Sequence, residues 1–248
     1  MDVSLMNKCK EGLSYHTLVL LFFFIPAHFL NAQTFKKSSY GAEVISSMNS
    51  FKTTIINDSN KQMVELKTKI PSIVYDLRYA GTNNFVKQAM YPINTSCTFL
   101  RLPAAIALRN VQTELNTQGL GLKIFDAYRP YAVTVKFWEL IRDERYVANP
   151  AKGSGHNRGL AVDLTIIELP SGKELDMGTG FDDFTDTAHH SFTNLSPAIL
   201  ANRTFLKSIM LKHGFQLFET EWWHYYWPNN RSYEVLDIDF RKLYRIIK

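Results

Sequence analysis

Hydrophobic and polar positions alternate with period two along residues 160–167, and this pattern predicts a β-strand. Asp163 falls on the less apolar face of that strand, so its side chain points away from the most hydrophobic face. The turn signal Ser171-Gly172 predicts that 174–177 pairs back on the strand as a hairpin partner. Further short strands are predicted at 73–79, 122–125 and 215–218.

Apolar residues at spacings of three and four predict three amphipathic helices. The first begins at Pro103 and is closed by Gly119 and Gly121. The second follows the motif Asp-Ala-Tyr-Arg-Pro at 126–130. The third begins at Ser196, which suits the N-cap position before a proline, and it ends at Gly214. The arginine of the 126–130 motif therefore lies at a strand-to-helix corner, where functional residues are often found.

The first 32 residues have the features of a secretory signal peptide. Two lysines precede an apolar run over 18–30, and Ala32 offers a small residue for cleavage. A permanent anchor is the alternative, but Pro26 interrupts the run, which is shorter than the roughly 20 apolar residues that a spanning helix needs. Cys9 lies before the run, whereas a lipoprotein carries its cysteine after it. We therefore expect an exported, periplasmic protein without stable membrane association after cleavage.

Length and composition indicate one globular domain with an appendage. We expect a signal peptide over 1–32, a loosely structured lead-in over 33–62 and a single domain over 63–248. The net charge of +5 comes from scattered Lys and Arg without a basic run, which argues against a nucleic-acid partner. After cleavage Cys97 would be the only cysteine, so no disulfide could form within the chain. The oligomeric state is left open by the sequence.

Two segments carry residue types that hold catalytic zinc, which usually has three His or carboxylate ligands and a fourth position open to water. The first segment is 154–163, in which His156 and Asp163 lie seven residues apart. In a straight strand this odd separation puts the two side chains on opposite faces. The chain must therefore bend between them, and Gly159 can adopt the backbone angles of such a bend. Alone, His156 is more often a hydrogen-bonded structural residue, and Asp163 an ordinary carboxylate on a strand surface.

The second segment is Glu-Trp-Trp-His at 221–224, whose first and last residues lie three apart, as on a helical turn or across a kinked loop. Glu221 could take a proton from a metal-activated water and pass it to the leaving amine. Arg129 could stabilise an oxyanion with its permanent charge, or it could be a salt-bridge partner. The two tryptophans are expected in the core. The adjacent histidines at 189–190 could also bind a metal, but adjacent side chains point apart and a polar loop is the favoured interpretation.

The pattern Ser-x-His-x-x-Gly-x-Ala-x-Asp at 154–163, followed by Glu-x-x-His at 221–224, resembles the D-alanyl-D-alanine dipeptidases of the VanX type, within the zinc D-Ala-D-Ala peptidases. The likeness also includes, in order, Asp-Leu-Arg-Tyr-Ala at 76–80, Asn84-Phe85, Asp-Ala-Tyr-Arg-Pro at 126–130, Met-Gly-Thr-Gly-Phe-Asp at 177–182, Ser191 and the aromatic-rich tail at 233–240. The resemblance implies an α+β fold: a small, mostly antiparallel sheet with helices packed on it, and a zinc site in a groove on the sheet.

The resemblance also implies a role for each candidate residue. One zinc ion per chain would be held by His156, Asp163 and His224. Glu221 would be the general base and acid, and Arg129 would stabilise the transition state. Three further residues would bind the dipeptide: Asp182 and Tyr79 at its ammonium group and Ser154 at its carboxylate. The alternative for Asp182 is a carboxylate that caps a turn. A closed pocket of this kind selects dipeptides, because a longer peptide leaves the buried carboxylate without its cation.

The expected function is zinc-dependent hydrolysis of D-alanyl-D-alanine to two D-alanines. One alternative is a D,D-carboxypeptidase that acts on longer peptidoglycan peptides, which shares the metal motif but needs an open cleft. Another is an inactive peptidoglycan-binding module with structural zinc, although such a site needs neither Glu221 nor Arg129. The predicted export departs from dipeptidases that confer glycopeptide resistance, because those act in the cytoplasm. It favours salvage or turnover of wall-derived dipeptide outside the inner membrane.

Overall fold

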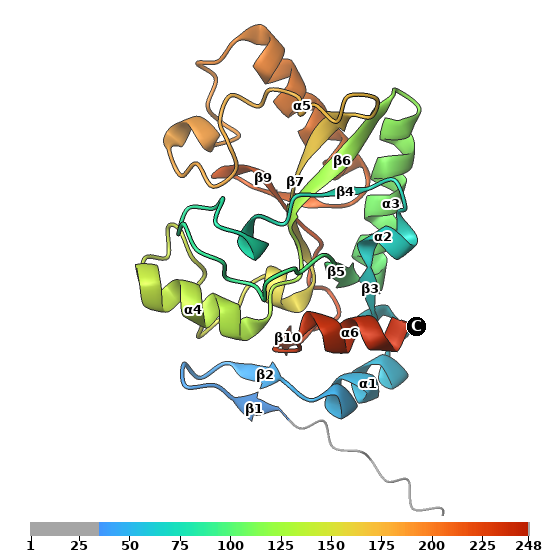
Figure 1. Ribbon diagram of the computed structural model, residues 1–248, viewed down its shortest axis with the longest axis vertical. Helices are drawn as coiled ribbons and strands as arrows, with labels where there is room; N and C mark the ends of the chain where they lie inside the picture. Colours follow the sequence, from blue (N-terminus) through green and yellow to red (C-terminus); the bar gives the residue numbers. More distant parts are fainter. Residues whose placement is uncertain (1–34, 248) are drawn as a thin grey trace, which may run out of the picture. The chain divides into compact units, whose positions relative to one another are not determined.

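The computed structural model describes residues 35–247, which lie within one compact unit, Gln33–Lys248. At its centre is a five-stranded sheet in the order β4-β6-β7-β9-β8 (Figure 1). Its strands are β4 (Val74–Tyr75), β6 (Leu120–Asp126), β7 (Ala161–Glu168), β8 (Gln216–Phe218) and β9 (Glu221–Tyr226). The β4–β6 pair is parallel and the other three pairs are antiparallel, which confirms the predicted small, mostly antiparallel sheet.

The predicted helices are present and contact this sheet. α3 (Leu102–Asn116) lies along β6, and α5 (Pro197–Lys212) packs against β8 and β9 (Figure 1). The side chain of Ser196 caps the first turn of α5, as the sequence predicts. α4 (Tyr131–Ile141) follows β6 after a short connection, so Arg129 does lie at a strand-to-helix corner. Helices and a mostly antiparallel sheet together confirm the α+β fold.

Two predicted strands are shorter than expected. The strand predicted over 73–79 is reduced to β4, because the chain turns into a 3-10 helix, η2 (Arg78–Ala80). An ion pair between Arg78 and Asp76, with 2.7 Å between Nε and Oδ2, accompanies this turn. The predicted hairpin partner at 174–177 contributes one isolated bridge to Ile167. In both segments an aspartate accepts a hydrogen bond from the residue two positions later, Asp76 from Arg78 and Asp176 from Gly178, and such local bonds compete with the pairing of strands.

The prediction of a helical turn or kinked loop at 221–224 is wrong, because these residues open β9. On one side His224 pairs directly with Asp163 of β7 in antiparallel register. On the other side the register against β8 shifts between Leu217 and Phe218. β9 is therefore regular beside β7 and distorted beside β8. The distortion explains how two side chains at an odd spacing on one strand reach the same site.

Residues 35–62 are more ordered than the predicted loosely structured lead-in. They form β1 (Lys36–Lys37), β2 (Glu43–Ile45), α1 (Met48–Asn57) and the 3-10 helix η1 (Ser59–Lys61). β2 pairs in parallel with β10 (Val235–Leu236), and Ile45 and Phe51 are buried in one cluster with Leu236. Because β10 lies almost 200 positions after β2, their pairing leaves no local pattern in the sequence. The sequence therefore underestimates how much regular structure this segment contains. The predicted signal peptide, 1–32, lies outside the described residues.

The remaining elements are β3 (Met63–Glu65), α2 (Leu66–Lys69), β5 (Phe99–Arg101), the 3-10 helices η3 (His156–Arg158) and η4 (Asp186–Ala188), and α6 (Phe240–Ile247). β3 and β5 form a separate two-stranded antiparallel sheet. Among residues 35–247, none of the helices combines the length and the apolar character that crossing a membrane requires.

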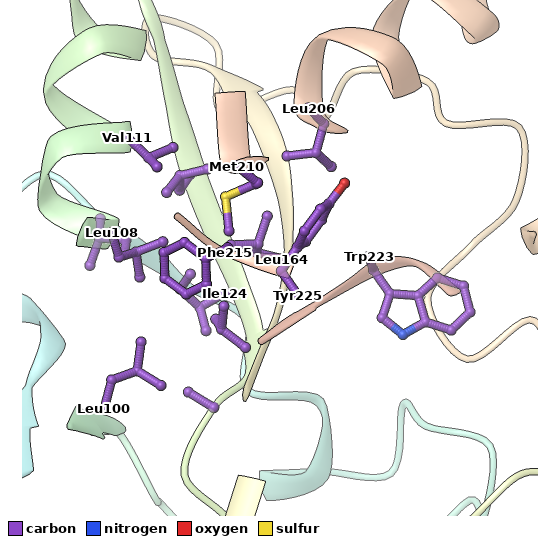
Figure 2. Close-up of a cluster of buried hydrophobic side chains, with 14 of the residues drawn as sticks. Leu100, Leu108, Val111, Ile124, Leu164, Leu206, Met210, Phe215, Trp223 and Tyr225 are labelled. Atoms are coloured by element: carbon purple, nitrogen blue, oxygen red, sulfur yellow. The ribbon is translucent and has the colours of Figure 1, made fainter. Parts of the chain in front are cut away.

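The largest hydrophobic core joins the central sheet to α3 and α5 (Figure 2). Ile124 and Leu164 from neighbouring strands pack with Leu108 of α3 and Met210 of α5, and all four are buried. The two predicted core tryptophans are buried as well. β7 is buried along both faces up to its last residue, including Asp163. Two of the three candidate metal ligands, Asp163 and His224, therefore lie on the neighbouring strands β7 and β9 of the central sheet, and buried central strands are the parts of a fold that open least readily.

Candidate active site

Arg129 is held at the corner between β6 and α4 by the carboxylate of Asp126. The Nε and Nη2 groups of Arg129 donate to Oδ2 of Asp126 at 3.1 and 2.7 Å, and the Tyr91 hydroxyl donates to Oδ1. The guanidinium lies over the rings of Tyr79 and Phe137, with 5.0 and 4.9 Å to the centroids. Arg129 is thus a salt-bridge partner, as one interpretation has it, but these bonds leave Nη1 able to donate to a substrate.

The predicted bend between His156 and Asp163 is present. His156 lies in η3, and Gly159 follows it in the left-handed conformation, with φ +67°. The Nδ1 atom of His156 lies 2.7 Å from the carbonyl oxygen of Ala127, to which it can donate only if it carries the ring proton. This leaves Nε2 as the ligand atom, and it lies 3.5 Å from Oδ2 of Asp163.

His224 completes a cluster of three potential metal ligands. Its Nδ1 atom lies 2.9 Å from Oδ1 of Asp163 and 3.4 Å from Nε2 of His156. All three ligand atoms lie within 4.8 Å of one another, and within residues 35–247 no other such group of His, Cys, Asp or Glu is found. Two imidazoles and one carboxylate are a donor set typical of catalytic zinc, so the residues present fit the metal.

These residues line a cavity of about 270 Å³. All eight residues that the sequence analysis names contribute to its wall: Tyr79, Arg129, Ser154, His156, Asp163, Asp182, Glu221 and His224. Aromatic residues contribute too, namely Phe85, Phe137, Tyr146, Phe184, Phe218 and Trp223. The volume lies below the roughly 300–1,000 Å³ of pockets for drug-sized ligands, which indicates a small substrate.

Glu221 reaches the cavity from the start of β9. Its Oε2 atom lies 3.7 Å from Nδ1 of His224. Burial raises the pKa of the Glu221 carboxyl to about 7; the neighbouring His224 lowers it, and the charge of Asp163 raises it further. A carboxylate beside the candidate metal ligands could exchange protons with a water molecule bound there.

Asp182 and Tyr79 form a polar pair on the cavity wall. The Tyr79 hydroxyl donates to both carboxylate oxygens of Asp182, at 3.0 and 3.2 Å. Burial, and then the charge of Asp163, raise the pKa of Asp182 to about 7. The turn-capping bond belongs to the next residue, Asp183, whose Oδ1 accepts the backbone N–H of Thr185 at 3.0 Å. The alternative interpretation of Asp182 as a turn cap therefore does not fit the structure.

Ser154 has a structural partner as well as a place on the cavity wall. Its Oγ accepts the backbone N–H of Asn157 at 3.1 Å, and its own N–H donates to Oδ1 of Asn157 at 2.9 Å. The side-chain amide of Asn157 donates to the carbonyl oxygen of Arg129 at 2.8 Å. Because the Ser154 hydroxyl accepts here, its proton can be donated to an anionic group in the cavity.

The cavity gathers three buried carboxyl groups without matching positive charges among residues 35–247. Asp163, Asp182 and Glu221 face it together, and in the part of the chain that the structure describes no Lys or Arg lies within ion-pair distance of any of them. Arg129, the nearest compensating charge, is paired with Asp126. Buried carboxylates keep their charge only when cations balance them, and without such cations their pKa rises, as it does at Asp182 and Glu221. The site is thus suited to two cations, one at the ligand cluster and one at Asp182.

Sequence reasoning missed two residues of the site. Asp126 holds Arg129, and the signals for it are its place directly after the strand predicted over 122–125 and its position at the start of the 126–130 motif. Tyr91 donates to Asp126 from 35 positions away, and nothing in the local sequence indicates this contact. The histidines at 189–190 line no part of the cavity and join no cluster of potential metal ligands among residues 35–247.

The bend at Gly159 gives a prediction for the metal site. In Gly159→Ala the new Cβ would lie 2.6 Å from Sδ and Cε of Met63, and alanine at φ +67° is strained by about 1–2 kcal/mol. We expect a lower midpoint of thermal unfolding and weaker metal binding, because His156 lies on the same turn. Metal affinity by competition with a chelator and thermal unfolding are the measurements.

Gly172→Ala is the matched control. Gly172 has φ +68°, but its Cβ would meet nothing within 4 Å, and it lies outside the cavity wall. This variant should lose stability through backbone strain alone and bind metal like the parent protein. Equal metal affinity in both variants would contradict a role for the Gly159 bend in placing His156.

The chain is similar to known D-Ala-D-Ala dipeptidases over most of its length. Peptidase M15, a family described as D-Ala-D-Ala dipeptidase, matches residues 59–242. The D-alanyl-D-alanine dipeptidase of Escherichia coli K12 is 35% identical over 179 residues, 72% of this chain and 91% of the relative. Those of Enterococcus faecalis V583 and Streptomyces coelicolor are 30% and 31% identical, over 64% and 63% of this chain and 88% and 86% of their own.

A solved structure of the LD-carboxypeptidase LdcB is 20% identical, with a TM-score of 0.35 over 60% of this chain and 70% of that chain, a likeness too weak to bear on function. The family match, by contrast, covers most of the chain, from residue 59 to residue 242. It spans both halves of the ligand cluster, the corner that carries Arg129 and the segment that carries Asp182. On the extent of that match, together with the identity to the E. coli relative, the chain belongs to the D-Ala-D-Ala dipeptidase family of peptidases.

Proposed function

We propose that this protein hydrolyses free D-alanyl-D-alanine, with a zinc ion held by His156, Asp163 and His224. The single observation that carries the proposal is the small cavity whose buried carboxylates exceed its positive charges. A metal dication and the ammonium group of a free dipeptide would supply the missing charge. Bound at the three ligands, zinc would act as a Lewis acid and make a water molecule acidic enough to be a nucleophile near neutral pH.

Glu221 acts as the general base and acid. Its carboxylate accepts a proton from the attacking water and donates it to the nitrogen of the leaving D-alanine. The raised pKa of Glu221 suits the second half of this task, since a carboxyl with a pKa near the working pH releases and takes up a proton readily. A nearby cation lowers that pKa again and so favours the carboxylate that starts the reaction.

Arg129 stabilises the oxyanion that forms when water attacks the peptide carbonyl. The Asp126 carboxylate fixes the guanidinium through two hydrogen bonds, and two aromatic rings cover its faces. A donor that is fixed before the reaction does not have to reorganise as charge develops on the oxygen. Asp126 is therefore a positioning residue, which acts through Arg129.

Asp182, Tyr79 and Ser154 select the substrate. Asp182 binds the free ammonium group of the dipeptide, while the Tyr79 hydroxyl holds the carboxylate in place. Ser154 donates its hydroxyl proton to the carboxylate of the substrate. A substrate with an amide in place of the ammonium would leave Asp182 buried and unpaired, which costs far more than the loss of a surface contact.

Comparison of two substrates tests this function. We expect the zinc-loaded protein to release D-alanine from free D-Ala-D-Ala, and to hydrolyse an N-acylated tripeptide ending in D-Ala-D-Ala at least about 10²-fold more slowly in kcat/KM. Efficient cleavage of the longer peptide with little action on the dipeptide would instead support the D,D-carboxypeptidase alternative. Zinc binding without hydrolysis of either substrate would support the inactive binding module.

Asp182→Asn sharpens this test. The amide keeps the shape of the side chain but removes the charge that pairs with the ammonium group. We expect KM for the free dipeptide to rise and the preference over the acylated peptide to shrink. Asp183→Asn is the matched control, because the Asp183 carboxylate caps a neighbouring turn and does not line the cavity. An unchanged preference in Asp182→Asn would contradict the assigned role.

We also propose that the enzyme works outside the cytoplasmic membrane, in salvage or turnover of wall-derived dipeptide. The lysines, apolar run and small residue within 1–32 support export. Fractionation of cells that express the full chain is the test. The processed protein should be found outside the cytoplasmic membrane, and an uncleaved protein in the cytoplasm would refute this location.

A further inference from the structure

Arg203 on α5 is a buried guanidinium without a carboxylate partner. The residue is 5% exposed, and its Nε and Nη1 groups donate to the carbonyl oxygens of Met177 and His189 at 2.6 and 3.2 Å. Its Nη2 atom is buried and has no hydrogen-bond partner. Among residues 35–247 no Asp or Glu lies within ion-pair distance of it. Burial lowers the pKa of this guanidinium, and the charges of Asp176 and Asp183, which lie beyond ion-pair distance, offset this only in part, so the buried charge has no direct counter-ion within the described protein.

Two more buried polar atoms without partners lie in the same region. The Tyr225 hydroxyl on β9 is one, and the Nε2 atom of His190 is the other. The rings of His190 and Tyr225 meet edge to face with 5.9 Å between centroids, and His190 follows directly on His189, whose carbonyl accepts from Arg203. Figure 2 shows the Tyr225 hydroxyl directed toward the helix that carries Leu206, which is α5. The charge of Arg203 acts on both His190 and Tyr225, so unpaired groups from the helix, the loop and the strand lie near one another.

All three groups can donate hydrogen bonds. Arg203 and Tyr225 carry N–H and O–H donors, and burial, together with the charge of Lys207, lowers the pKa of His190 to about 4. The imidazole is therefore neutral near pH 7, and its single proton can reside on Nε2. A water molecule could accept these bonds, but it would bring no charge to balance the guanidinium. An anion supplies both the acceptor and the counter-charge.

We propose that Arg203, Tyr225 and His190 bind a small monovalent anion, chloride under ordinary conditions. The ion has to be compact, because all three atoms are shielded from solvent. None of the three residues lines the 270 Å³ cavity, so the site is separate from the peptidase centre. It joins α5 and the segment around 190 to β9, the strand that carries Glu221 and His224. The ion would thus contact Tyr225 on one face of β9, while the neighbouring His224 contributes to the active site from the opposite face.

Thermal unfolding of the full, metal-loaded chain in different sodium salts tests this proposal. At constant ionic strength, chloride or bromide in place of gluconate should raise the unfolding midpoint by about 2–4 °C, because ligands of the folded state stabilise it. Tyr225→Phe keeps the ring and removes the hydroxyl, so it should reduce this response. Arg203→Met removes the positive charge that the anion would balance, and it should abolish the halide response. Bromide-soaked crystals should show an anomalous peak beside Arg203.

Arg109→Met is the matched control, since it removes an exposed positive charge from α3 and should leave the halide response intact. Equal midpoints in chloride and gluconate would overturn the proposal and indicate a water molecule at the site. A halide response that persists in both Arg203→Met and Tyr225→Phe would also overturn it and place the anion elsewhere, for example at the metal. If Arg203→Met does not fold, the crystal peak and Tyr225→Phe still decide the question.

Discussion

Glu221→Gln is expected to lower kcat for D-Ala-D-Ala by about 10²–10⁴-fold, the range that a general base contributes. Glutamine preserves the shape of the side chain and leaves the backbone pairing at the start of β9 unchanged, but its amide cannot accept a proton from water. The three proposed metal ligands are untouched, so the metal content should match that of the parent. The measurement is kcat together with zinc per chain from elemental analysis.

Glu219→Gln is the control for this variant. Glu219 lies two residues earlier, is exposed and does not line the cavity, so the same chemical change there should leave kcat unchanged. If Glu221→Gln retained most of its activity, the proton would have to move through another group. If it lost its metal, the loss of activity would report on the ligand cluster instead of on the base.

Arg129→Lys is expected to lower kcat by about 10²–10³-fold with little change in KM, because a missing oxyanion donor weakens binding of the transition state only. Lysine keeps the charge, but it lacks the fork that donates two hydrogen bonds to Asp126 while a third group faces the substrate. The measurement is steady-state kinetics on the free dipeptide, with zinc content determined in parallel.

Arg142→Lys serves as the comparison, because Arg142 is exposed just after α4 and makes no contribution to the cavity wall. It should behave like the parent in both constants. A raised KM with unchanged kcat in Arg129→Lys would show that Arg129 binds the ground state of the dipeptide, and the proposed role at the oxyanion would then be wrong.

The sequence predicts much of the site because short motifs carry most of its residues. His156, Gly159 and Asp163 fall within ten positions, and the odd spacing already requires the bend that the structure contains. The helices and the main strands are also predictable, since each has its own period and its own terminal signals, such as Ser196 before α5.

What the sequence does not predict depends on partners far along the chain. The hydroxyl of Tyr91 meets Asp126 only after folding, and β2 is ordered by β10, which lies near the other end of the chain. The segment 221–224 has no strand period, because a distortion beside β8 compensates for its odd spacing. The periodicity of a segment indicates which residues share a face of a regular helix or strand. It contains no information on a register shift that arises from pairing with another strand.

The pairing of Asp163 with His224 across β7 and β9 ties the metal site to the order in which the chain emerges during synthesis. The two ligands are 61 positions apart and face one another only when β9 has been added to the sheet. A nascent or truncated chain that ends before residue 224 therefore holds no more than two of the three donors. The full donor set of the proposed metal site is thereby assembled only when nearly the whole polypeptide has been made.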